Sequence, residues 1–182
     1  MSGKIEIIIG CMFSGKSTEN IRLINRFKCI KSKILVIKHN FDKRYDDGSK
    51  LTTHNNTQID CQSNDNLISY FTKEVFLKSD IIVVEEAQFF DDLFEFATKS
   101  ADIYGKTIIV SGLDGDFKRC PFGDILKLIP HCEKVTRLNA LCSDCNDGTK
   151  AYFTKRITNE AGVNVIGTND KYKAVCRKCY LK

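Results

Sequence analysis

The sequence predicts an α/β protein with an open parallel sheet, and two observations support this prediction. Short runs rich in Ile and Val, without polar alternation, recur at 5–9, 34–37, 81–84 and 107–111. Such runs are typical of strands that helices cover on both faces, as in parallel sheets. Segments with the apolar spacing of helices separate these runs, and this alternation indicates a single open α/β sheet.

Three helices are expected between the strands, at 17–28, 65–76 and 91–104. The first of them follows the first strand after one short loop. Asp91 or Asp92 can serve as the N-cap or as a first-turn acid of the third helix. These helices supply the crossover connections that neighbouring parallel strands require.

A further apolar stretch at 135–138 can add a fifth strand, and two regions break the alternation. The polar segment 39–57 is expected to form a mobile loop beside the site. The chain after about Leu141 is expected to form a separate small unit. We therefore predict a first domain at 1–141 and a second at 142–182.

Composition restricts the class of protein. The chain has 182 residues, 42% of them hydrophobic, and its net charge of +5 is too mild to argue for nucleic acid. No apolar run approaches the ~20 residues of a membrane span, and the N-terminus lacks the features of a signal peptide. The nine cysteines are an odd number without a secretion signal, which favours a metal site and free thiols over disulfides. A cytoplasmic protein is expected.

The first loop, GCMFSGKS at residues 10–17, matches the phosphate-binding pattern in its required position between a strand and a helix. Its glycines allow backbone N–H groups to surround phosphate oxygens. Lys16 is expected to reach the β and γ phosphates, and the hydroxyl of Ser17 is expected to bind Mg²⁺. A chance match in a turn is the alternative. The predicted loop consists of Gly10, Cys11, Met12, Phe13, Ser14, Gly15, Lys16 and Ser17.

Two adjacent carboxylates, Glu85 and Glu86, directly follow the apolar run 81–84. Ligands of open α/β sheets bind at the carboxyl ends of the strands, so both acids are expected beside the phosphate loop. One can face metal-bound phosphates, directly or through water, and the other can face the phosphate acceptor. The alternative is that both acids are merely the solvated start of a loop.

Two C-x-x-C pairs lie in the last 41 residues, and 30 residues separate them. Four thiolates of this kind can bind a tetrahedral structural zinc ion, and the long segment between the pairs would then be held at both ends. A redox role for one pair is the competing interpretation. The predicted zinc ligands are Cys142, Cys145, Cys176 and Cys179.

The motifs also occur in a specific order. The chain contains GxMFSGKST, an acid pair followed by QFF, then LDGDFKRCPFGDIL, C-x-x-C, TKR, VIGTNDKY and VCRKCY. This ordered set closely resembles the cellular-type (type II) thymidine kinase family, which includes poxvirus enzymes. The resemblance runs almost end to end. It implies a P-loop α/β nucleotide-binding domain and a zinc-anchored segment, the lasso, which covers the nucleoside.

The resemblance implies a role for several polar residues. Glu86 takes the position of the general base, and Glu85 takes the metal-side position, where the family usually has Asp and where Mg²⁺ is bound directly or through water. Asp42 and Arg44 match the D-x-R-Y segment that contacts phosphates of ATP. Cys11 stands where the family usually has Pro, so a thiol is expected near the phosphates.

The resemblance also implies a nucleoside pocket with aromatic walls and a loop backbone that hydrogen-bonds the pyrimidine. Cys120 replaces a basic residue near this pocket, and Thr168 replaces the second glycine of a pair in the lasso. The implied pocket residues are Met12, Phe89, Leu113, Phe117, Phe122, Thr154, Val163, Asn164, Val165, Ile166, Gly167 and Tyr172.

The expected function is ATP-dependent phosphorylation of thymidine, and of deoxyuridine, to the monophosphate in deoxynucleotide salvage. The resemblance implies Mg²⁺ with ATP, a structural Zn²⁺, a homotetramer and possible feedback inhibition by dTTP; no membrane or nucleic-acid partner is expected. One rival is a zinc-ribbon, nucleic-acid-binding ATPase, since 142–182 holds eight basic against four acidic residues. A P-loop sensor without turnover is another.

Overall fold

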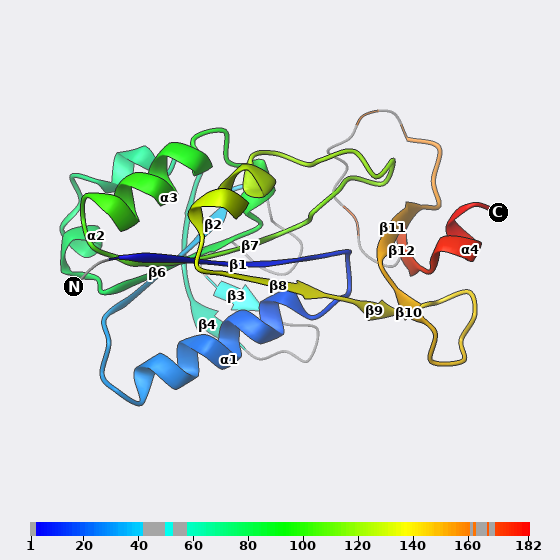
Figure 1. Cartoon of the computed structure of the whole chain (residues 1–182), viewed down its shortest axis with the longest axis horizontal. Helices are drawn as coiled ribbons and strands as arrows, with labels where there is room; N and C mark the ends of the chain where they lie inside the picture. The colour runs from blue at the N-terminus through cyan, green and yellow to red at the C-terminus, as the bar shows by residue number, and fades with distance from the viewer. Residues whose placement is uncertain (1–2, 42–49, 53–57, 161, 163–166, 168–169) are drawn as a thin grey trace.

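The computed structural model describes residues 3–41, 50–52, 58–160, 162, 167 and 170–182. Six parallel strands form the central sheet, in the order β5-β2-β6-β7-β1-β8 (Figure 1). Five of them confirm the predicted strands. Their bounds are β1 Lys4–Gly10, β2 Ile34–His39, β6 Ile81–Glu85, β7 Thr107–Gly112 and β8 Lys134–Leu138. The sixth, β5, is short and was not predicted; it spans Gln62–Asn64.

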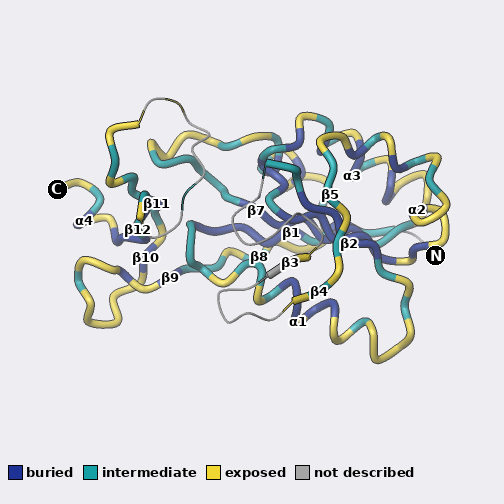
Figure 2. Tube along the Cα trace, turned by 180° about the vertical axis from the view of Figure 1, so that it is seen from behind, coloured by how far each residue is buried: buried dark blue, intermediate teal, exposed yellow. Residues whose placement is uncertain are grey.

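Helices cover the two faces of this sheet. Helix α1 (Lys16–Lys28) confirms the first predicted helix and packs Ile21 and Ile24 on one face. The other face is covered by α2 (Glu74–Lys78), α3 (Leu93–Asp102) and the 3₁₀ helix η3 (Ile125–His131). Figure 2 shows the central strands as a buried layer. All five residues of β6 are buried, as its unbroken apolar pattern predicts.

The helix predicted at 65–76 is wrong. The chain forms a short 3₁₀ helix, η1 (Ile68–Tyr70), and then α2, and between them Lys73 has an extended backbone. The N–H groups of Leu67 and Ile68, which have no partner within the first helical turn, donate to the carboxylate of Asp92 at 2.8 Å. Asp92 also occupies the N-cap position of α3, but its side chain makes no capping bond there.

Beyond the carboxyl ends of the strands, the end of the chain forms two small antiparallel sheets and a short helix (Figure 1). We refer to these elements as the C-terminal unit. The first sheet pairs β9 with β10 and the second pairs β11 with β12. Their bounds are β9 Ala140–Leu141, β10 Lys150–Ala151, β11 Phe153–Arg156, β12 Tyr172–Val175 and α4 Arg177–Tyr180.

A third antiparallel pair, β3 (Lys50–Thr52) with β4 (Gln58–Asp60), lies within and just after the polar segment. The larger part of the segment predicted as a mobile loop, 39–57, lies outside the described residues. Since β1 and β6 run parallel on either side of β7, the phosphate loop and the acid pair emerge at the same edge of the sheet.

Candidate active site

The loop between β1 and α1 has the tight geometry that its glycines predict. A Cβ atom at Gly10 would lie 2.5 Å from the carbonyl oxygen of Leu138, so a larger residue does not fit. Gly15 precedes α1 with φ of 85°, a conformation that glycine adopts readily. The ammonium of Lys16 donates to the carbonyl oxygens of Cys11, at 2.9 Å, and Gly10, at 3.3 Å. Lys16 therefore lies across the loop that it is expected to serve.

Glu85, at the end of β6, is buried and tied to α1. Asn20 donates its amide N–H to Glu85 Oε2 at 2.7 Å, and the hydroxyl of Ser111 donates to the same oxygen. Burial, followed by the charge of Glu86, raises the pKa of Glu85 to about 7. Its other oxygen, Oε1, is buried without a hydrogen-bond partner among the described residues. A buried oxygen of this kind is suited to a cation.

Glu86 has a left-handed backbone, with φ of 51°, and the 3₁₀ helix η2 (Ala87–Phe89) follows it. Gln88 donates its amide N–H to Glu86 Oε2 at 2.5 Å. The amide oxygen of Gln88 accepts the N–H of Leu113 at 3.0 Å. Gln88 therefore orients Glu86 and joins it to the segment after β7, and sequence reasoning missed this role.

Two expected pocket residues, Phe89 and Phe122, belong to a cluster of aromatic rings. The ring of Phe89 lies 5.5 Å from Phe122, edge to face, and 5.1 Å from Phe41. The ring of His39 also lies near Phe89, with 5.9 Å between the ring centres. The structure thus brings Phe89 and Phe122 together, and it adds Phe41, which sequence reasoning missed.

Four further pocket residues, Met12, Phe117, Thr154 and Tyr172, make contacts that involve the C-terminal unit. The N–H of Met12 donates to Thr154 Oγ1 at 3.0 Å. Arg156 donates to the hydroxyl of Tyr172 at 2.8 Å, and its guanidinium lies 3.8 Å from the centre of the Phe117 ring. The chain fold therefore brings three separate segments to one place beside the phosphate loop.

The two C-x-x-C pairs form one cluster. The four sulfur atoms of Cys142, Cys145, Cys176 and Cys179 lie within 4.8 Å of one another, and none of the nine cysteines forms a disulfide. Four thiols at this spacing fit a tetrahedral zinc ion. Both pairs take part, which favours one shared metal site over a redox role for a single pair.

One protein-family model covers the phosphate loop, the acid pair and the four-cysteine cluster. The family model described as thymidine kinase matches residues 3–180. The chain belongs to the thymidine kinase family.

Curated thymidine kinases are similar along nearly the whole chain. The Sheeppox virus (strain KS-1) enzyme is 46% identical over 178 residues, which cover 98% of this chain and 97% of the relative. The cytosolic thymidine kinase of Cricetulus griseus is 43% identical, covering 99% of this chain and 74% of the relative. The chain is therefore a phosphotransferase of the thymidine kinase type. A solved structure, the flagellar accessory protein FlaH of Methanocaldococcus jannaschii, aligns with 88% of this chain and 75% of that chain at 15% identity and a TM-score of 0.49.

Some residues that the thymidine kinase motifs predict lie outside the described residues. These are Asp42 and Arg44 of the polar segment, Val163, Asn164, Val165 and Ile166 of the lasso, and the departure Thr168. Within the part of the chain that the structure describes, no helix is both long and apolar enough to span a membrane.

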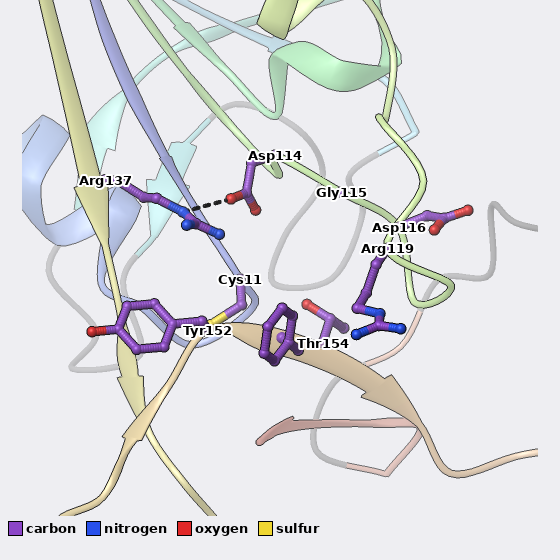
Figure 3. Close-up of a pocket in the computed structure, with 9 residues that line it drawn as sticks. Cys11, Asp114, Gly115, Asp116, Arg119, Arg137, Tyr152 and Thr154 are labelled. Carbon is purple, nitrogen blue, oxygen red and sulfur yellow. Dashed lines mark hydrogen bonds and ion pairs between the residues drawn. The ribbon is translucent and has the colours of Figure 1, made fainter. Parts of the chain in front are cut away.

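A cavity of about 150 Å³ lies where the phosphate loop meets the C-terminal unit of this thymidine kinase (Figure 3). The guanidinium Nε of Arg137 donates to Asp114 Oδ2 at 2.9 Å, and Arg119 lies over the ring of Tyr180. Asp116 accepts the backbone N–H groups of Lys118 and Cys120. Cys11 also lines the cavity, and its buried thiol donates to the carbonyl oxygen of Ala151. The thiol of Cys11 is thus part of the contact between the phosphate loop and the C-terminal unit.

Proposed function

We propose that the chain transfers the γ-phosphoryl group of ATP to the 5′-hydroxyl of thymidine, and of deoxyuridine. The hydrogen bond from Asn20 to Glu85 carries this proposal, because it fixes the acid pair against the helix that follows the phosphate loop. Donor phosphates at the N-terminus of α1 would then lie beside both carboxylates. The reaction is inferred from membership of the family, and the placement of the acid pair beside the donor phosphates is inferred from the contact between Asn20 and Glu85.

The residues present fit Mg²⁺. The buried Oε1 of Glu85 lacks a hydrogen-bond partner among the described residues, and the Ser17 hydroxyl is close enough to lower the pKa of Glu85. Ser17 and Glu85, directly or through water, would hold the ion, which supplies charge neutralisation to the transferring phosphoryl group. Lys16 and the N–H groups of the loop would hold the remaining phosphate oxygens.

Glu86 would accept the proton of the nucleoside 5′-hydroxyl. Its bond from Gln88 holds one carboxylate oxygen, and the backbone strain at φ of 51° is typical of residues in functional sites. Because the same Gln88 contacts Leu113, an expected wall of the pocket, the position of the base is coupled to the acceptor site.

Further parts of the proposal rest on the family resemblance. We infer that zinc occupies the four-cysteine cluster, that 142–182 acts as a lasso domain on a P-loop domain at 1–141, and that Asp42 and Arg44 contact ATP. Val163 to Gly167 would bind the base. A homotetramer, inhibition by dTTP and a cytoplasmic location complete the proposal; the cytosolic relative from Cricetulus griseus supports the location.

One assay tests the proposed reaction. Release of ADP is measured with thymidine, deoxyuridine, deoxycytidine and ribonucleosides, each with Mg²⁺ and ATP. The expected result is turnover with thymidine and deoxyuridine. ATP binding without ADP release from any nucleoside would instead indicate a sensor. Salt-dependent affinity for DNA comparable to the affinity for thymidine would indicate a nucleic-acid-binding ATPase.

A further inference from the structure

Arg156, the last residue of β11, contacts two aromatic rings and the backbone of the segment that follows β11. Its guanidinium lies 3.8 Å from the centre of the Phe117 ring and 5.3 Å from that of Tyr172. One terminal nitrogen donates to the hydroxyl of Tyr172 at 2.8 Å. Arg156 therefore links two aromatic residues that are distant in sequence.

The same guanidinium also holds backbone. Its other terminal nitrogen donates to the carbonyl oxygen of Gly162 at 2.5 Å and to that of Glu160 at 3.3 Å. A second contact supports this segment, since the ammonium of Lys171 donates to the carboxylate of Glu160 at 2.8 Å. The segment at Glu160 and Gly162 is therefore bonded to Arg156 at the end of β11 and to Lys171, which directly precedes β12.

These contacts require the shape of arginine. A planar guanidinium can stack on a ring and donate in its own plane to separate acceptors at the same time. A lysine in this position would keep the charge, but its compact ammonium presents no flat face and cannot span the hydroxyl and both carbonyl oxygens. The contacts thus predict a measurable difference between arginine and lysine.

We propose that Arg156 is a positioning residue of the nucleoside site, which holds the rings of Phe117 and Tyr172 and the backbone at Glu160 and Gly162 as one unit. The proposal rests on the proposed function, because it takes Phe117 and Tyr172 as walls of the pyrimidine pocket. The contacts that define this role lie on the ring of Phe117, on Tyr172 of β12 and on the backbone at Glu160 and Gly162. Its loss should therefore weaken nucleoside binding and leave the ATP site largely unchanged.

Steady-state kinetics of the zinc-loaded protein test this selectivity. In Arg156→Ala, the KM for thymidine should rise by about tenfold or more, with the KM for ATP within about twofold of wild type. The KM of Arg156→Lys for thymidine should lie between those of wild type and Arg156→Ala. Arg156→Lys serves as the test variant if Arg156→Ala does not fold. Arg177→Ala is the matched control, since Arg177 stacks on Phe153 at 4.9 Å, outside the expected pocket; its kinetics should equal wild type.

A second measurement does not depend on turnover. Digestion with a glutamate-specific protease should cut after Glu160 faster in Arg156→Ala than in wild type, while cutting after the exposed Glu74 in α2 stays the same. A thymidine KM within about twofold of wild type, equal rises in both KM values, or unchanged cutting after Glu160 would each overturn the proposal. Failure of the proposed function would show separately, as a wild-type protein that releases no ADP with thymidine.

Discussion

The backbone N–H of Met12 donates a hydrogen bond of 3.0 Å to the Oγ1 atom of the buried Thr154. This bond joins the phosphate loop to β11 of the C-terminal unit. The thiol of Cys11 makes a second contact of the same kind, to Ala151. The loop that would bind ATP is therefore supported from the unit that would bind the nucleoside.

Replacement of Thr154 by Val should consequently affect both substrates. Valine keeps the shape but leaves the N–H of Met12 without its acceptor, at a cost of about 1–3 kcal/mol. We expect the KM values for ATP and thymidine to rise together in steady-state kinetics. Thr154→Ser keeps the oxygen and should retain the wild-type KM for ATP. A Val variant in which only the thymidine KM rises would show that Thr154 serves the pocket alone.

Replacement of Glu86 by Gln should remove turnover but not binding. The amide keeps an oxygen that can accept from Gln88, so the fold should persist, while the base is lost. The expected decrease in kcat is about 10²–10⁴-fold. Calorimetric titration with ATP and thymidine, together with the melting temperature, would check that binding and folding are intact. A kcat near that of wild type would refute the assignment of the base.

Replacement of Glu85 by Gln should change how stability depends on pH. The folded protein holds the pKa of Glu85 at about 7, above the ordinary 4.5, so the fold binds this proton more tightly than the unfolded chain does. Stability from this group is complete below pH 4.5 and is lost as the pH rises through 7. Since Gln does not ionise, the variant should exceed wild type by about 1 kcal/mol at pH 5 and by about 3 kcal/mol at pH 8.

Denaturant unfolding in magnesium-free buffer at pH 5, 6 and 8 measures this difference. Magnesium is omitted because a bound cation would favour the ionised carboxylate and lower its pKa. Parallel pH profiles for Glu85→Gln and wild type would contradict the raised pKa.

Replacement of one cysteine of the four-cysteine cluster should lower both the zinc content and the stability of the protein. Cys145→Ser leaves three thiol ligands, so zinc content should fall below one per chain and the melting temperature should drop. Because β11 supports the phosphate loop through Thr154, the affinity for ATP should fall as well. Cys120→Ser is the matched control, since Cys120 is exposed and outside the cluster, and it should retain full zinc. A Cys145→Ser protein with wild-type zinc content and melting temperature would exclude a zinc-binding role.

The success of the strand predictions has a physical cause. Strands such as β6 are buried on both faces, so their residues must be apolar, and the pattern is visible in the sequence. Strand β5 lies at the edge of the sheet and consists of Gln, Ser and Asn, so no apolar run marks it. The helix expected at 65–76 is interrupted at Lys73, whose backbone is extended, and its first N–H groups, those of Leu67 and Ile68, bond to Asp92, a partner distant in sequence.

In the candidate site, too, some features are visible in the sequence and others are not. The phosphate loop, the acid pair and the cysteine pairs have characteristic residue types and spacing, which local sequence reveals. The partners that orient them do not. Asn20 contacts Glu85 across 65 positions, and Arg156 reaches Phe117 only once the C-terminal unit has formed. Contacts of this kind depend on the tertiary fold, so only the structure shows them.

The burial of Cys11 has a practical consequence for chemical reagents. Burial raises the pKa of this thiol, and the thiol is covered by the C-terminal unit. Because thiolates, and not thiols, react with electrophiles, a thiol-directed inhibitor aimed at the phosphate loop should find no thiolate at Cys11 while the C-terminal unit covers it. The rate at which an alkylating reagent labels Cys11 would therefore measure how often the C-terminal unit separates from the phosphate loop.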